Sequence, residues 1–161
     1  MWRAGPPTQG RRGCRGNRVG MSQTAPLQLL AIDPDDLAVL SAALQDAVAR
    51  VGDIAYEPKA RRLTIAFNRY RWEAGQRQRV RSALQVGGVM GVQTRRIRRE
   101  RRDAVVELLS LDFKAGEAPG GVLMLTFAGG GDLRAQVECV DAVLADVSAP
   151  WPTPRTPQHE P

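Results

Sequence analysis

Residues 27–52 read LQLLAIDPDDLAVLSAALQDAVARVG and contain a strand pattern followed at once by a helix pattern. The apolar run 27–32 predicts a first strand. Asp33 then predicts a helix N-cap, with Pro34 at the first helical position and further acids near the positive helix end. From there apolar residues recur at steps of three and four, which predicts a helix of about 17 residues. They are Leu37, Leu40, Leu44, Val48 and Val51, followed by Gly52 as the expected C′ residue.

After residue 53 the apolar period changes to about two, which indicates strands. These strands are expected at residues 54–56, 63–67, 80–86, 89–97, 105–113, 122–127 and 133–139. Residues 140–147 return to a helical spacing and predict a short final helix that ends before Pro150.

Short loops and alternating patterns favour an antiparallel sheet with helices packed on one side. The sequence therefore predicts an α+β fold. Its mostly antiparallel, strongly bent sheet would have about seven or eight strands, with one N-terminal and one short C-terminal helix. A pleckstrin-homology-like partial barrel, closed by the last helix, is one concrete possibility.

The length of 161 residues predicts one domain, at residues 26–148, between two atypical ends. Residues 1–20 contain five Arg and no acid, with almost no large apolar residue, so we expect a disordered Arg/Gly-rich arm. Met21 is an alternative start, and the arm would then be an over-extended reading of the gene. Residues 149–161 contain five of the eleven Pro and predict an extended or disordered tail.

The net charge of +6 at pH 7 is concentrated at the N-terminal end, because residues 21–161 contain 18 basic and 17 acidic side chains. Arg outnumbers Lys 21 to 2, which indicates a coding bias more than selection for phosphate binding. No apolar run reaches the ~20 residues of a membrane span. The first residues also lack the apolar core of a secretory signal. We therefore expect a cytoplasmic protein with no membrane partner.

Five short motifs follow one another along the chain. They are Phe67-Asn-Arg-Tyr-Arg-Trp-Glu73, Ala118-Pro-Gly-Gly121, Phe127-Ala-Gly-Gly-Gly131, Glu138-Cys139 and Ala149-Pro-Trp151. Together they resemble segments of an uncharacterised bacterial family, catalogued as domain of unknown function 2948, and the similarity covers roughly Leu27 to Trp151. The resemblance implies a small, single-domain, cytoplasmic protein without an assigned activity, and it carries over no catalytic residue.

The residue types of common catalytic chemistry are scarce in the expected domain. The single His, His159, lies in the Pro-rich tail, which excludes a Ser-His-Asp or Cys-His arrangement within residues 26–148. Cys14, Cys139 and this His are too few for a zinc site. Cys139 shares the strand parity of Val137, which predicts a buried and unreactive thiol. We expect no catalytic residue, no cofactor and no metal.

An Arg-rich run between two predicted strands is the strongest candidate for binding. It consists of Arg95, Arg96, Arg98, Arg99, Arg101 and Arg102. A protruding basic hairpin at this place would contact nucleic-acid phosphate, although no aromatic residues for base stacking interleave with it. The alternatives are a solvated loop that keeps a sheet edge from pairing, and a contact with an acidic protein partner.

Arg69 and Arg71 form a second candidate, because they alternate with Tyr70 and Trp72. If both aromatic residues face the core, both arginines face outward as a cationic strip that would bind a carboxylate or phosphate. Ordinary surface arginines are the other interpretation. The change of parity after Asn68 indicates either a bulge or a strand that is covered on both faces.

These patterns favour a small, non-catalytic cytoplasmic domain that acts through an unidentified protein partner or as an accessory subunit. One alternative is nucleic-acid binding through Arg95–Arg102. The other is a protein that binds small anions, or an enzyme that works without His, using carboxylates, Tyr and Arg. The patterns do not define an oligomeric state.

Overall fold

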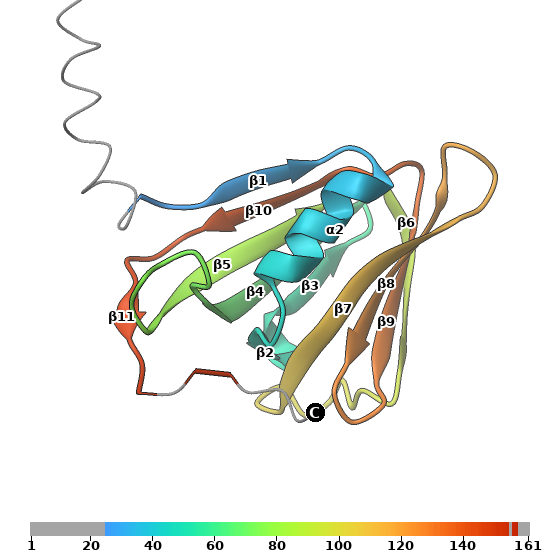
Figure 1. The fold of residues 1–161 in the computed structure, drawn as a ribbon. Coiled ribbons are helices and arrows are strands. Elements are labelled where there is room, and N and C mark those ends of the chain that lie inside the picture. The colour runs from blue at the N-terminus through green and yellow to red at the C-terminus, as the bar shows by residue number, and fades with distance from the viewer. Residues whose placement is uncertain (1–24, 155, 158–161) are drawn as a thin grey trace, which may run out of the picture.

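The structure is a computed structural model, and it describes residues 25–154 and 156–157. Within these residues it contains eleven strands and one α-helix, arranged as an open sheet in which all pairs are antiparallel (Figure 1). The predicted α+β class with a mostly antiparallel sheet is confirmed. The predicted number of strands was too low, and the prediction of two α-helices was wrong. The N-terminal arm, Met21, Cys14 and His159 lie outside the described residues.

The strands, in chain order, are β1 (Gln28–Ala31), β2 (Val48–Arg50), β3 (Ile54–Glu57), β4 (Arg62–Tyr70), β5 (Gln78–Val86), β6 (Val89–Arg95), β7 (Val105–Ala115), β8 (Gly121–Phe127), β9 (Asp132–Val137), β10 (Ala142–Asp146) and β11 (Trp151–Pro152). The helix α2 covers Pro34–Ala43, and the short 3-10 helix η1 covers Val51–Asp53. The order in the sheet is β1-β10-β5-β4-β2-β7-β8-β9-β6, with β3 paired to β4 and β11 paired to β5.

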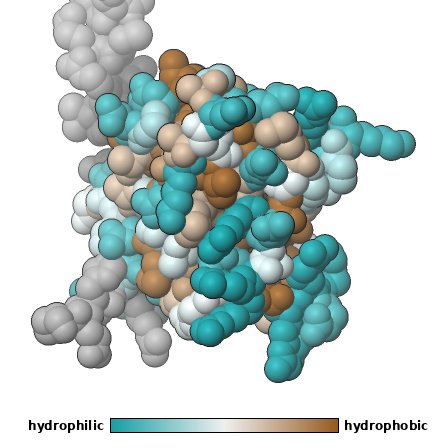
Figure 2. All heavy atoms as spheres, turned by 90° about the vertical axis from the view of Figure 1, so that its right-hand side faces the viewer, coloured by the Kyte–Doolittle hydropathy of each residue, from teal (hydrophilic) through white to brown (hydrophobic). Residues whose placement is uncertain are grey.

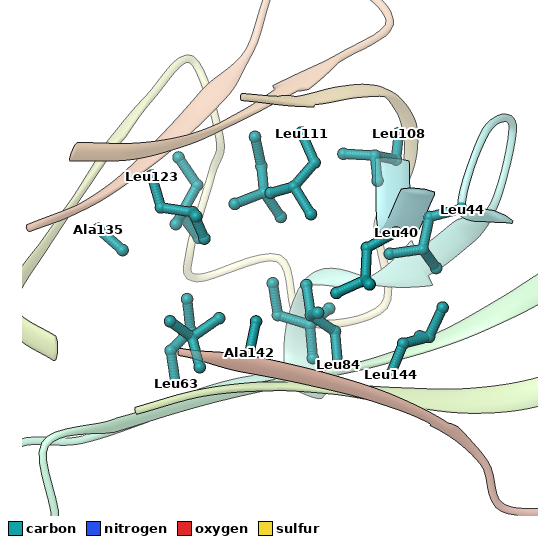
Figure 3. Packing of buried hydrophobic residues seen from close by; sticks show 14 of the residues in the cluster. Leu40, Leu44, Leu63, Leu84, Leu108, Leu111, Leu123, Ala135, Ala142 and Leu144 are labelled. Atoms are coloured by element: carbon teal, nitrogen blue, oxygen red, sulfur yellow. The ribbon is translucent and has the colours of Figure 1, made fainter. Parts of the chain in front are cut away.

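The sheet bends into two facing layers at the short strand β2. Val48 of β2 pairs with Asn68 of β4, and all of β2 pairs with β7. One layer therefore holds β1, β10, β5, β4 and β3, and the other holds β7, β8, β9 and β6. Figure 3 shows Leu63 of the first layer opposite Leu123 of the second, and Leu84 of the first layer opposite Leu111 of the second. The apolar core lies between the layers, as expected for a strongly bent sheet.

Helix α2 begins where the sequence predicts and ends earlier than predicted. Asp33 is the N-cap, and its Oδ1 accepts a hydrogen bond from the Asp36 N–H at 2.7 Å. The helix stops at Ala43, and Asp46 follows in the left-handed region with φ 63°. Val48 then starts β2 instead of a further helical turn. The expected helix end at Gly52 is therefore wrong, because pairing with β7 takes Val48–Arg50 into the sheet, and Val51–Asp53 form η1.

The predicted C-terminal helix is also wrong. Residues 142–146 form β10, which pairs with β1 on one side and with β5 on the other. A barrel closed by a last helix is therefore not what the described residues form. Instead α2 packs against β7 and β1, at the opening between the two layers (Figure 1). Among the described residues, no helix has both the length and the apolar character that crossing a membrane requires.

Candidate functional site

Arg69 and Arg71 lie inside the molecule, so the predicted cationic strip on the surface is wrong. The pairing of β4 with β5 runs in regular register as far as Tyr70, without a bulge at Asn68. Strand β4 is instead covered on both faces, which is the second of the two expected alternatives. Arg69 points the same way as the buried Phe67, while Tyr70 is covered by the C-terminal segment, where its Oη lies 3.2 Å from Oγ1 of Thr156.

Arg69 is the centre of a buried ion network. Its Nε and Nη2 donate to Oδ1 and Oδ2 of Asp146 at 3.0 and 3.1 Å, and its Nη1 and Nη2 donate to Glu73 at 3.1 and 2.8 Å. Asp146 also accepts from the Ser82 hydroxyl at 2.6 Å and from the Leu27 N–H at 2.9 Å. The Asp146 side chain is 2% exposed. The network therefore ties β4, β5 and β10 to the residue before β1.

The charges of this network hold each other in the ionised state. Desolvation lowers the pKa of Arg69, but the hydrogen bonds and charges of Glu73 and Asp146 outweigh it and raise this pKa above its ordinary value. Desolvation raises the pKa of Asp146, but hydrogen bonds from Arg69, Ser82 and the Leu27 backbone lower it overall. The pKa of Glu73 is also lowered, because the Arg69 guanidinium outweighs desolvation. A general acid or base needs a pKa near the working pH, and these shifts move the pKa values of all three groups further from neutral pH.

We expect the network to make the protein less stable in acid. The pKa values of Asp146 and Glu73 are lower in the folded protein than in the unfolded chain. Their contribution is therefore present above the ordinary carboxyl pKa values and is lost as the pH falls through the lowered ones. Urea unfolding between about pH 7 and pH 3 measures this loss. The Asp146→Asn variant should lose less stability over this range than the parent, and an equal loss in both would contradict the assignment.

The Arg-rich run is a crossing between strands rather than the predicted hairpin. β6 pairs with β9 and β7 pairs with β8, so β6 and β7 lie at opposite ends of their layer. Residues 96–104 therefore run from one end of the layer to the other, and we call them the arginine crossing. The sequence did not show this because alternation marks a strand without identifying its partner.

Both ends of the arginine crossing are held in place. Arg95, just before it, donates from Nη2 to Oδ2 of Asp132 at 2.7 Å. At the other end, the carbonyls of Arg102 and Ala104 accept hydrogen bonds from the N–H groups of Gly52 and Val51, each at 2.8 Å. A Cβ at position 52 would lie 3.0 Å from the Arg102 carbonyl oxygen, so the absence of a side chain at Gly52 allows the two backbones to come this close.

The arginine crossing covers a pocket between two strand edges. Among the described strands, β3 pairs only with β4, and β6 pairs only with β9. The Tyr56 side chain bridges β3 and β6, because its Oη donates to the Val89 carbonyl at 3.2 Å. Beyond this contact lies a pocket of about 290 Å³, which we call the seam pocket. Its apolar lining consists of Val51, Ile54, Val92, Ile97 and Leu133. Its polar lining consists of Tyr56, Thr94, Arg99 and Arg102.

The arginine crossing also concentrates positive charge. It contains five Arg against Glu100 and Asp103, so its net charge is +3. In the part of the chain that the structure describes, none of these five arginines has a carboxylate within 4.0 Å. Of the other arginines described there, only Arg50, Arg77 and Arg79 also lack a carboxylate at this distance. Figure 2 faces the layer of β6 to β9 and shows large hydrophilic side chains projecting at its lower end, where β6 leaves the layer in Figure 1.

Several residues of these two sites carried no signal that the patterns could use. Tyr56 and Thr94 line one pocket from two strands that do not pair, and Ser82 has an ordinary place in an alternating strand. The one local sign that Asp146 has a special role is that it is the single acid in the otherwise apolar run 142–147. Cys139 is exposed, which contradicts the predicted buried thiol, because β9 and its alternation end at Val137. Within the described ranges, no three His, Cys, Asp or Glu side chains are grouped so that they could hold a metal ion.

Comparison with known proteins adds one finding. A family model described as "Protein of unknown function (DUF2948)" matches residues 27–159, which include the buried network and the seam pocket. The resemblance inferred from the short motifs is therefore confirmed. No curated protein and no solved structure matches the chain.

Proposed function

The chain belongs to the DUF2948 family, and since the description of that family names no activity, we propose from the structure that this is a non-catalytic domain that binds an acidic protein partner. The binding surface is the arginine crossing. The observation that carries the proposal is the cluster of five arginines without a carboxylate partner among the described residues. Guanidinium groups match carboxylates in geometry and charge, so an acidic segment would supply the partners that these arginines lack.

The way the arginine crossing is held supports a binding role. Its ends are fixed by the Arg95–Asp132 ion pair and by the backbone hydrogen bonds of Gly52 and Val51. A segment that is already ordered loses less conformational entropy when a partner binds. Its net positive charge would also steer an acidic partner toward it.

The alternatives from the sequence have less support. Residues 96–104 contain no aromatic residue for stacking a base. The alternative of a small-anion site or an enzyme at Arg69 and Arg71 loses its candidate residues. Arg69 is occupied by Asp146 and Glu73, and Arg71 donates from Nη1 to Gln78 Oε1.

A charge-matched pair of variants tests the proposal. In the full chain, Arg96, Arg98, Arg99 and Arg101 are replaced by Ser in one variant, and Arg3, Arg11, Arg12 and Arg15 in the other. Affinity for a labelled polyglutamate peptide is then measured against salt concentration. We expect the first variant to bind at least about tenfold more weakly at low salt, because four charge pairs are lost. The second variant should bind nearly as well as the parent.

Two results would overturn the proposal. One is an equal loss in both variants, because the binding would then follow net charge rather than the arginine crossing. The other is that the same arginines bind DNA or RNA, single- or double-stranded, more tightly than they bind polyglutamate of equal charge. That result would assign the surface to nucleic acid, for which the slope of affinity against salt counts the phosphate contacts.

A further inference from the structure

We propose that the seam pocket binds a short aliphatic chain that ends in a carboxylate. The chain would lie on the apolar lining, and the carboxylate would accept hydrogen bonds from Arg99 and Arg102. This inference goes beyond the proposed function, because it requires a pocket and two particular arginines, whereas an acidic partner requires only the surface charge of the crossing.

The lining of the seam pocket is an extension of the core that the protein itself does not fill. Leu133 is fully buried, and Val51 is buried except for 8% of its surface. Ile54, Val92 and Ile97 are partly buried and pack against the core cluster. The apolar lining is therefore held in position by the core. An aliphatic chain placed on it would remove apolar surface from water, which is the main driving force for binding in such pockets.

The seam pocket is bounded along the seam, which sets the size of its occupant. The Tyr56 Oη to Val89 carbonyl hydrogen bond crosses the seam on one side, and the Gly52 N–H to Arg102 carbonyl hydrogen bond crosses it on the other. A volume of about 290 Å³ is at the small end of the range for ligand pockets. The pocket therefore fits one short chain better than an added strand.

The mouth of the seam pocket offers cationic donors. Arg102 Nη2 donates to the Gly52 carbonyl at 3.2 Å, which holds one guanidinium at the pocket. A guanidinium has several N–H donors, so others remain for a ligand. Arg99 has no carboxylate partner among the described residues, and Thr94 adds a hydroxyl. Asp132, the acid of the adjoining pocket, is already paired with Arg95. The charge and shape of the site therefore complement a carboxylate on an apolar chain.

Two sources supply this chemistry, namely a free short-chain fatty acid and the free C-terminus of a polypeptide that ends in leucine. The full-length protein is titrated with hexanoate, and with a peptide that ends in leucine, while its backbone amide NMR signals are recorded. Acetate, hexanamide and the C-terminally amidated peptide are the controls, because each lacks either the chain or the charge. We expect saturable shifts at Val92 and Thr94, with the controls at least about tenfold weaker. If only the peptide binds, its C-terminus is the source.

Variants separate this site from the proposed acidic-partner surface. Arg99→Gln with Arg102→Gln should weaken hexanoate binding at least about tenfold. Arg98→Gln with Arg101→Gln removes the same charge from the same segment without touching the pocket lining, and it should change the affinity by less than about twofold. Thr94→Phe, which places a ring in the pocket, should abolish hexanoate binding and leave polyglutamate binding intact.

The amide spectrum of each variant shows whether it is folded, and the two arginine pairs keep the test decisive if Thr94→Phe is not. Equal losses for the two pairs of arginines would overturn the pocket assignment, and so would shifts that do not saturate with either hexanoate or the peptide. Neither result would affect the polyglutamate test. Conversely, hexanoate binding that persists while polyglutamate binding is absent would overturn the proposed function alone.

Discussion

Replacing Asp146 with alanine is expected to lower the free energy of unfolding by about 3–5 kcal/mol, because it leaves the buried Arg69 charge without its buried partner. Arg69 has no exposed side-chain surface, and Glu73, its other partner, is 39% exposed. The Ser82 hydroxyl and the Leu27 N–H lose their acceptor as well. A donor such as the Ser82 hydroxyl or the Leu27 N–H, if it is buried and left without an acceptor, costs roughly 1–3 kcal/mol. Urea unfolding at neutral pH measures the total.

A second ion pair gives the control. Asp53→Ala breaks the ion pair between Asp53 and Arg81. The Arg81 side chain is 38% exposed and the Asp53 side chain is 32% exposed, so the loss should cost less than about 1 kcal/mol. The double variant Arg69→Met with Asp146→Leu removes both buried charges, and it should recover much of the stability that Asp146→Ala loses. If Asp146→Ala were no more costly than Asp53→Ala, the network would not be a main support of the fold.

The start of α2 could be predicted because all of its determinants are adjacent in the sequence. Asp33 caps the helix, Pro34 fits its first position, and the two acids that follow lie within the first turn. The end of α2 has no such local signal. Val48 continues the spacing of a helix, but it belongs to β2, which pairs with strands that begin later in the chain, and that pairing decides its structure.

Strand β10 shows why the C-terminal region was mistaken for a helix. It has a paired strand on each side, and Ala142 and Leu144 on its inner face are buried while Val143 on its outer face is partly covered. A strand of this kind has apolar residues on both faces, so the alternation that marks a strand disappears. What remains is a short apolar run, which spacing alone does not distinguish from a helix.

The two candidate sites differ in how much of them the sequence contained. The arginine crossing is visible in the sequence as composition, but its path from β6 to β7 has no local signal. Arg69 was expected on the surface because its neighbours Tyr70 and Trp72 were assumed to face the core, and its buried partner Asp146 is 77 residues away. The seam pocket depends on residues of β3 and β6 lying side by side around one cavity, which no local pattern specifies.

Replacing Leu40 with alanine should lower the free energy of unfolding by about 3–5 kcal/mol, through lost apolar burial and the cavity that remains. Leu40 is 0% exposed and belongs to α2, the one α-helix among the described residues. Figure 3 places it between Leu108 of one layer and Leu84 of the other. Paired strands flank this position on both sides and are fixed by their hydrogen bonds, so the cavity would close only in part. Thermal and urea unfolding measure the loss.

The neighbouring residue is the control for this substitution. Val39→Ala removes apolar carbons from the same helix, but Val39 is 54% exposed, so the cost should stay within about 0.5 kcal/mol beyond the change in helix propensity. A small cost for Leu40→Ala as well would mean that α2 covers the layers without joining them. A large cost for Leu40→Ala and a small cost for Val39→Ala would show that α2 stabilises the opening between the layers. The sequence had assigned this role to a C-terminal helix, which the structure replaces with β10.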